Sequence, residues 1–186
     1  MMKNNLRRWF WALLLSLATP LAAAQDLSGL KQVVLSNANG EERVVIGHVF
    51  FDTAGEGRWK FDLRLDESRF TEHFLAMRPF KCLTGARQQL CHFPFGKERI
   101  ITRDDLAPLE YSLMFLHKKP ASVHVDSANG IYYQLAWGEK GLRGQLFDVD
   151  MDPIIVPQGD MRRPFRKEHL LQAHPGSHWL PRLSIE

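Results

Sequence analysis

The alternation of apolar and charged residues is clearest at positions 59–66, Trp-Lys-Phe-Asp-Leu-Arg-Leu-Asp, where every odd residue is apolar. A period of two is that of a strand with one buried and one wet face. Two apolar runs precede it, Val-Val-Leu at 33–35 and a run rich in Val, Ile and Phe at 43–51. Turn residues separate the runs at 37–40, which ends in Asn-Gly, and at 53–57, and Asn-Gly tolerates the positive φ of tight hairpins. The N-terminal third therefore predicts a three-stranded meander.

The second half of the chain has the same character. Residues 111–117 and 122–126 are strand-like, residues 131–137 alternate, and residues 142–150 follow a Gly-Glu-Lys-Gly turn. Within the last segment the adjacent apolar pair 146–147 breaks the alternation. This break predicts a β-bulge or burial on both faces of the strand.

Helical patterns are short. Residues 67–78 place four side chains on one helical face and end at Pro79. These four are Phe70, His73, Phe74 and Met77. Residues 102–105 resemble a capping box before a brief helical turn, and residues 167–173 could form two turns.

These elements predict a mainly β fold with about nine strands and two or three short helices. Hairpin-length links favour antiparallel pairing, and the pattern leaves a small barrel and a sandwich open. The chain has 186 residues, of which 45% are hydrophobic and 24% charged, as in an ordinary globular domain. We expect residues 25–186 to form one domain and a monomer, with the apolar tail at 176–186 packing back as a last strand.

The first 24 residues have the features of a cleaved signal peptide, with cleavage before Gln25. The basic residues at its start are Lys3, Arg7 and Arg8. The apolar stretch 9–21 is shorter than the roughly 20 residues that span a bilayer, and three alanines at 22–24 suit signal peptidase. We therefore expect export to the periplasm or beyond, without a stable membrane anchor. General secretory and twin-arginine export both stay open, because the adjacent arginines also fit the latter.

The charge balance argues against nucleic acid as a partner. The chain has 24 Lys and Arg against 21 Asp and Glu, a formal charge of +3. The three basic residues of the signal segment account for this excess, which leaves 21 basic against 21 acidic residues afterwards. A nucleic-acid-binding surface needs a real excess of basic residues.

Two cysteines, Cys82 and Cys91, are the only ones in the chain. In an exported protein such a pair predicts a disulfide. Each lies in a short apolar segment, 80–83 or 90–93, and the turn between the segments contains Thr-Gly. We therefore expect the bridge to join two neighbouring strands.

Asp148, Asp150 and Asp152 have the spacing with which a calcium-binding EF-hand loop begins. The loop does not continue, because its sixth position is Pro153 and its twelfth is Gly159. On a strand the three carboxylates would instead lie on one face, where a divalent metal could hold them together.

A second candidate metal set lies near the C-terminus: His169, His174 and His178. The last two have the H-x₃-H spacing that places imidazoles on one helical face for zinc or copper. Pro175 and Gly176 lie between them, so that only a loop could bring them together.

Aromatic residues provide a candidate ligand site. Trp59, Tyr132, Tyr133 and Trp137 could line a cavity for an apolar ligand or fill the core. Tyr132 is out of phase with its neighbour, so we expect it on the opposite face of the strand, as an exposed contact residue.

No nucleophile elbow (G-x-S-x-G) and no H-E-x-x-H motif occurs in the sequence. We therefore interpret the chain as a non-enzymatic exported binding or envelope-associated module for a small apolar ligand or another exported protein. A metal-dependent exported enzyme, and a structural or inhibitory partner of an exported protein, are the alternatives. No cofactor is expected beyond a divalent metal at the aspartate set or the histidine set.

Overall fold

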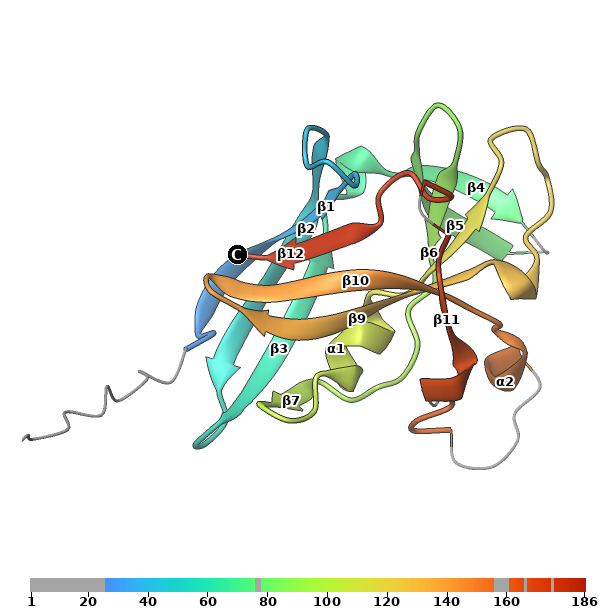
Figure 1. Ribbon diagram of the computed structural model, residues 1–186. Helices are drawn as coiled ribbons and strands as arrows, with labels where there is room; N and C mark the ends of the chain where they lie inside the picture. The colour runs from blue at the N-terminus through green and yellow to red at the C-terminus, as the bar shows by residue number, and fades with distance from the viewer. Residues whose placement is uncertain (1–25, 76–77, 156–160, 166, 175) are drawn as a thin grey trace, which may run out of the picture.

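A computed structural model describes residues 26–75, 78–155, 161–165, 167–174 and 176–186 (Figure 1). The strands are β1 (Gly29–Ser36), β2 (Arg43–Thr53), β3 (Arg58–Leu65), β4 (Thr71–Leu75), β5 (Arg78–Thr84), β6 (Gln89–His92), β7 (Ile100–Thr102), β8 (Phe115–Lys118), β9 (Gly130–Gly138), β10 (Gly141–Val149), β11 (Leu170–Gln172) and β12 (Arg182–Ile185). The helical elements are α1 (Ala107–Ser112), α2 (Asp152–Ile155) and the 3-10 turns η1 (Glu67–Arg69), η2 (Ser127–Asn129) and η3 (Lys167–His169).

The twelve strands of the described residues form one antiparallel sheet that is not closed into a barrel. Their order is β4-β5-β6-β8-β9-β10-β12-β1-β2-β3-β7, and β11 pairs with the remaining edge of β10. The predicted mainly β, antiparallel fold is confirmed. Three more strands are present than the roughly nine expected, because β4, β7 and β11 are short segments without a clear alternation.

The N-terminal meander is confirmed by the pairing of β1 with β2 and of β2 with β3. In β3, Trp59 and Phe61 are buried, whereas Lys60 and Asp62 are exposed, as the alternation predicts. A register shift between Val33 and its neighbour interrupts the β1–β2 ladder. The meander therefore presents one apolar face to the interior.

Apolar side chains on the two faces of the sheet form two separate clusters. The larger cluster includes Tyr133 and receives Leu109 and Leu113 from the helical segment around α1. The smaller one includes Tyr132 and is covered by Phe165. Neighbouring residues of β9 thus belong to different clusters, since successive side chains of a strand point to opposite faces.

Only the last part of β10, from Leu146 to Val149, is covered on both faces, whereas Arg143 and Gln145 earlier in the strand are exposed. Burial on both faces, one of the two predicted outcomes, is thus confined to the end of the strand. Its register with β9 is continuous, so the strand contains no bulge. Leu146 belongs to the larger cluster and Val149 to the smaller one. On its other edge β10 pairs first with β12 and then with β11, and the Leu146 amide between them donates to the Pro181 carbonyl at 3.1 Å.

The helix predicted for residues 67–78 is wrong. The chain forms η1 and then β4, which pairs with β5 through Thr71 opposite Cys82. In this strand Leu75 is buried while Phe74 is 71% exposed, so the apolar spacing did not mark a buried helical face. Pairing with β5 overrides the local pattern, and Met77 lies outside the described residues.

Three other boundaries differ from the prediction. The strand expected at 111–117 is shorter, because Tyr111 and Ser112 end α1 and β8 begins at Phe115. No strand forms at 122–126, and residues 167–173 contain η3 and β11 rather than two helical turns. The helical turn expected after 102–105 is present as α1.

The C-terminal tail forms β12, as predicted, and lies between the N-terminal strand and β10 (Figure 1). Ile185 is opposite Val33 on one side and Leu142 on the other. Among the described residues, no helix has the length and apolar character needed to cross a membrane. The predicted signal peptide, residues 1–24 with cleavage before Gln25, lies outside the described residues.

The disulfide between Cys82 and Cys91 is present, as predicted. The two cysteines are directly opposite on β5 and β6, and both are fully buried in the smaller cluster. Their sequence separation is 9 residues. The bridge therefore fixes the register of one hairpin.

Reduction of this disulfide should lower the free energy of unfolding by about 2.7 kcal/mol, the loop-closure value for a ring of about ten residues. Urea unfolding with and without reductant measures the difference. The variant Cys82→Ala/Cys91→Ala should be destabilised to a similar or larger extent and should lose its sensitivity to reductant. Equal midpoints for the oxidised and reduced chain would contradict this role.

A buried carboxylate, Glu110 of α1, connects the helix to β9. It accepts hydrogen bonds from the Tyr132 hydroxyl and, at 2.6 Å, from the Leu135 amide. Burial raises the pKa of Glu110 above its ordinary value, although the two hydrogen bonds oppose this shift. The native chain thus holds this proton more tightly than the unfolded chain does.

The free energy of unfolding should therefore fall as the pH rises from the ordinary glutamate pKa through the raised pKa of Glu110. In Glu110→Gln the amide oxygen can still accept from the Leu135 amide, and this pH-dependent loss should disappear. Urea unfolding of both chains between about pH 4 and about pH 8 tests this. The variant Glu139→Gln, at an exposed position, serves as a control. If the stability of the wild type and of Glu110→Gln depended on pH in the same way, the predicted role of Glu110 would be refuted.

Candidate metal centre

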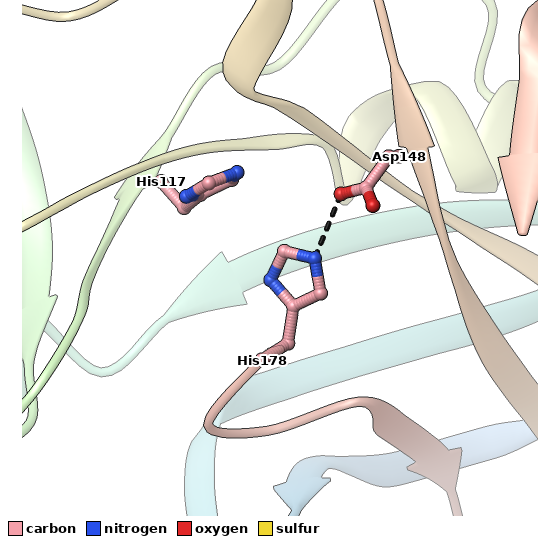
Figure 2. Close-up of side chains that lie close together, drawn as sticks. All are labelled: His117, Asp148 and His178. Atoms are coloured by element: carbon pink, nitrogen blue, oxygen red, sulfur yellow. Dashed lines mark hydrogen bonds and ion pairs between the residues drawn. The ribbon is translucent and has the colours of Figure 1, made fainter. Parts of the chain in front are cut away.

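Three side chains from distant parts of the sequence meet on one face of the sheet, over its central strands: His117, Asp148 and His178 (Figure 2). Their potential ligand atoms all lie within 4.8 Å of one another. Among the described residues this is the only such group of three histidine, cysteine or acidic side chains. It therefore provides the best-defined site for chemistry in the molecule.

The sheet places two of the three. Strands β8 and β10 flank β9, and Ile131 of β9 is opposite both Phe115 and Asp148. His117 follows Phe115 by two residues, so both point to the face of the larger cluster. Asp148 follows Leu146 in the same way and faces the same side. The pairing across β9 thus brings an imidazole and a carboxylate together.

The third ligand arrives on residues 173–181, the connection between β11 and β12. We call this connection the strap. Its Leu180 carbonyl accepts from the Tyr133 hydroxyl at 2.7 Å, and its Trp179 indole donates to Glu42 at 2.8 Å. Gly85 makes room for Trp179, because a Cβ at position 85 would lie 2.5 Å from the indole ring. These contacts hold His178 over the end of the larger cluster.

A chain of hydrogen bonds fixes the protonation of His178. The Trp179 backbone amide donates to the side-chain oxygen of Gln88 at 3.0 Å. The side-chain nitrogen of Gln88 therefore faces His178 Nδ1, also at 3.0 Å. Nδ1 must then accept, and Nε2–H donates to Asp148 Oδ1 at 2.7 Å (Figure 2). His178 is thereby held as the neutral tautomer protonated at Nε2.

His117 is not part of this series of hydrogen bonds. Its ring packs edge-on against His178 with centroids 4.8 Å apart, and within the described residues it makes no hydrogen bond. Burial lowers the pKa of His117 and the neighbouring His178 adds to the effect, although Asp148 opposes it. A neutral His117 ring thus offers one nitrogen lone pair near Asp148, and no donor among the described residues occupies it.

The group lies between two cavities. His117 lines one of about 350 Å³, together with Gln88, Arg87 and Lys119. His178 lines another of about 720 Å³, beside the strap. A ligand or solvent could therefore approach the group from either side.

Only two of the six predicted metal ligands belong to this group, Asp148 and His178. Asp150 accepts a hydrogen bond from the Asp152 amide at 2.9 Å, and neither acid joins the group. His169 lies in η3, and His174 lines the larger cavity without joining the group. His117 and Gln88 had no recognisable signal in the sequence, because their proximity follows from strand order and from the path of the strap.

The four predicted ligand-binding aromatics do not meet in one place. Trp59 and Trp137 are in contact, with ring centroids 5.4 Å apart, while Tyr133 is buried in the larger cluster. Tyr132 faces the opposite side, as predicted, but it is buried rather than exposed because Phe165 and α1 cover that face. None of the four lines a cavity described for this part of the chain, and their role in binding stays a prediction.

Two imidazole nitrogens and one carboxylate oxygen form a donor set suited to divalent first-row transition metals, zinc and iron among them. Comparison of the chain with protein-family models, curated proteins and solved structures found no match. The chemistry of the three side chains is thus what indicates a ligand.

Proposed function

We propose that this chain is an exported binding module that holds a divalent transition-metal ion between His117, Asp148 and His178. The observation that carries the proposal is the convergence of the three donors within 4.8 Å from β8, β10 and the strap. Two nitrogen ligands and one oxygen ligand leave a fourth position of a tetrahedral ion to water or to a ligand in one of the cavities.

The geometry requires a small adjustment. Bonds of about 2.0–2.1 Å to a tetrahedral zinc ion place neighbouring donors about 3.3 Å apart. Asp148 and His178 are already closer than this, at 2.7 Å, so that the ion would separate them slightly. The donors that are still farthest apart, at no more than 4.8 Å, would have to approach each other by up to about 1.5 Å. Movement of the half-buried His117 ring would supply this approach.

Metal binding also requires a change of tautomer at His178. An ion on Nε2 displaces the proton there to Nδ1, which must then donate instead of accept. The Gln88 amide would rotate to present its oxygen and leave the Trp179 amide without its acceptor. The loss costs about 1–3 kcal/mol, which is small against the ~10–16 kcal/mol with which small structural sites bind zinc.

A purely structural role would explain part of the group. The hydrogen bonds from Trp179 through Gln88 and His178 to Asp148 attach the strap to the sheet without any ion. They do not explain His117, whose ring makes no hydrogen bond among the described residues and points into the same space. This residue favours a metal centre over a structural attachment.

A metal-dependent enzyme is the second candidate function. Three protein ligands with a fourth position open are the arrangement of catalytic zinc centres, and the two flanking cavities could admit a substrate. Turnover of a hydrolysable ester or phosphoester by the zinc-loaded chain, abolished in His117→Ala, would favour this candidate over simple binding.

The chain without an affinity tag should bind one equivalent of Zn²⁺ in isothermal titration calorimetry, and Co²⁺ should give the visible bands of a tetrahedral ion. His117→Ala should weaken zinc binding by about 100-fold or more, about 2.7 kcal/mol, because it removes one of three ligands. The exposed His124→Ala is the matched control and should bind as the wild type does.

Because His117 lies outside the hydrogen-bonded chain, its replacement should leave the thermal midpoint unchanged. Asp148→Asn gives a second check, since the amide oxygen still accepts from His178 while the anionic ligand is lost. Zinc affinity that survives both changes would refute the proposed site, as would the absence of binding by the wild type.

Gln88→Glu should increase zinc affinity by about tenfold or more at pH 8, where histidine is neutral. One carboxylate oxygen can accept from the Trp179 amide while the other accepts from Nδ1–H of a metal-bound His178, so no hydrogen bond is lost. Calorimetry of the wild type and of Gln88→Glu makes the comparison. Weaker binding by this variant would show that the ion does not use His178 Nε2.

A further inference from the structure

A third cavity, of about 640 Å³, lies beside α1 on the face of the smaller cluster. Its walls come from residues 94–98, from Pro108 and Tyr111, and from residues 161–163. The volume is within the range of about 300–1,000 Å³ that is typical of small-molecule sites. No residue of the metal centre contributes to it, so a ligand in this cavity would be independent of the proposed metal function.

The interior of this cavity is mainly carbon. Phe95 and Tyr111 meet edge to face with centroids 5.8 Å apart, and Pro94, Pro108 and Met161 complete the apolar lining. The Tyr111 hydroxyl oxygen accepts from the Phe165 amide at 3.2 Å, which places this polar group against the protein. Such a lining would favour an alkyl or aromatic body over a polar one.

The walls are tied to one another. The Phe95 amide donates to the Tyr111 carbonyl at 2.9 Å, which fixes the first segment against α1. Arg163 attaches its own segment to the first wall through Glu98 at 3.0 Å, and to Asp105, just ahead of α1, at 2.7 Å. The cavity is therefore largely formed before a ligand arrives, which reduces the ordering cost of binding.

The charges of the lining are unequal. Lys97, Arg162 and Arg163 carry positive charge, and Glu98 is the one acidic residue of the described lining. Arg163 is already paired with Glu98 and Asp105, so the charge that a ligand would meet is that of Lys97. Lys97 is exposed and has no acidic partner among the described residues. An anionic group at the mouth would therefore be stabilised, whereas a cationic one would be repelled.

We propose that the cavity binds an amphipathic monoanion, with its alkyl or aromatic body on Phe95, Tyr111 and Met161 and its carboxylate beside Lys97 at the mouth. A neutral apolar molecule would fill the same space without the interaction at the mouth. A cationic amphiphile would be repelled by the basic side chains there. The carboxylate is what distinguishes this ligand class.

Titration calorimetry of the purified chain with sodium laurate, below its micelle concentration, tests the proposal. Laurate should bind with one equivalent and with a negative heat-capacity change, which marks the burial of apolar surface. 1-Dodecanol should bind about tenfold more weakly and dodecyltrimethylammonium more weakly still. Laurate affinity should also fall as salt is added.

Two variants locate the ligand. Met161→Trp fills the cavity at a half-exposed position and should abolish laurate binding. Lys97→Glu should weaken laurate binding by about fivefold. It should also reduce the ratio of the affinity for laurate to the affinity for dodecyltrimethylammonium. Lys140→Glu makes the same charge change at the exposed turn between β9 and β10, outside the cavity lining, and should have no effect.

Three results would overturn the proposal. Laurate binding that persists in Met161→Trp would place the ligand elsewhere on the molecule. Equal affinity for laurate and dodecanol would show that the mouth does not recognise an anion. Failure of the wild-type chain to bind laurate at its solubility limit would show that the cavity does not take this ligand class.

Discussion

The pairing of β12 with both β1 and β10 joins the N-terminal meander to the rest of the sheet, and the arrangement around the candidate metal centre depends on it. This strand spans only Arg182–Ile185 and leaves the far part of the β10 edge to β11. The chain between these two strands must therefore leave the sheet and return to it. In doing so it forms the strap, which carries His178 over the larger cluster to Asp148 (Figures 1 and 2).

The buried side chains Gln88, His178 and Glu110 all have hydrogen-bond partners, whereas the buried Gln89 Oε1 has none among the described residues. Gln88 and His178 are both buried, and their hydrogen bonds continue from the Trp179 amide to Asp148. On the other face, Glu110 is bonded to Tyr132 and to a backbone amide. An unsatisfied group in such a place costs about 1–3 kcal/mol, so these chains fix one arrangement of side chains. They also make the tautomer of His178 part of any ligand binding.

The local features of the fold could be predicted from the sequence, whereas contacts across the sheet could not. Alternation at 59–66 and the Asn-Gly turn identify strands and hairpins because their causes lie within a few residues. Strand β4 carries a helix-like spacing that only its pairing with β5 overrides. Because sequence patterns are local, Asp148 and His178 could each be named as a metal ligand, but only as members of two separate sets. Their proximity to His117 requires the order β8-β9-β10 and the path of the strap.

The two candidate sites lie on opposite faces of the sheet, and β9 separates them. Tyr133 contacts the strap on one face, while Tyr132 and Tyr111 pack together on the other, where Tyr111 also borders the apolar cavity. Because β9 is paired along its whole length with β10, it has little freedom to transmit a shift from one face to the other. Binding at one site should therefore leave affinity at the other unchanged, since coupling needs an element with two alternative arrangements. The two candidate sites should therefore act independently.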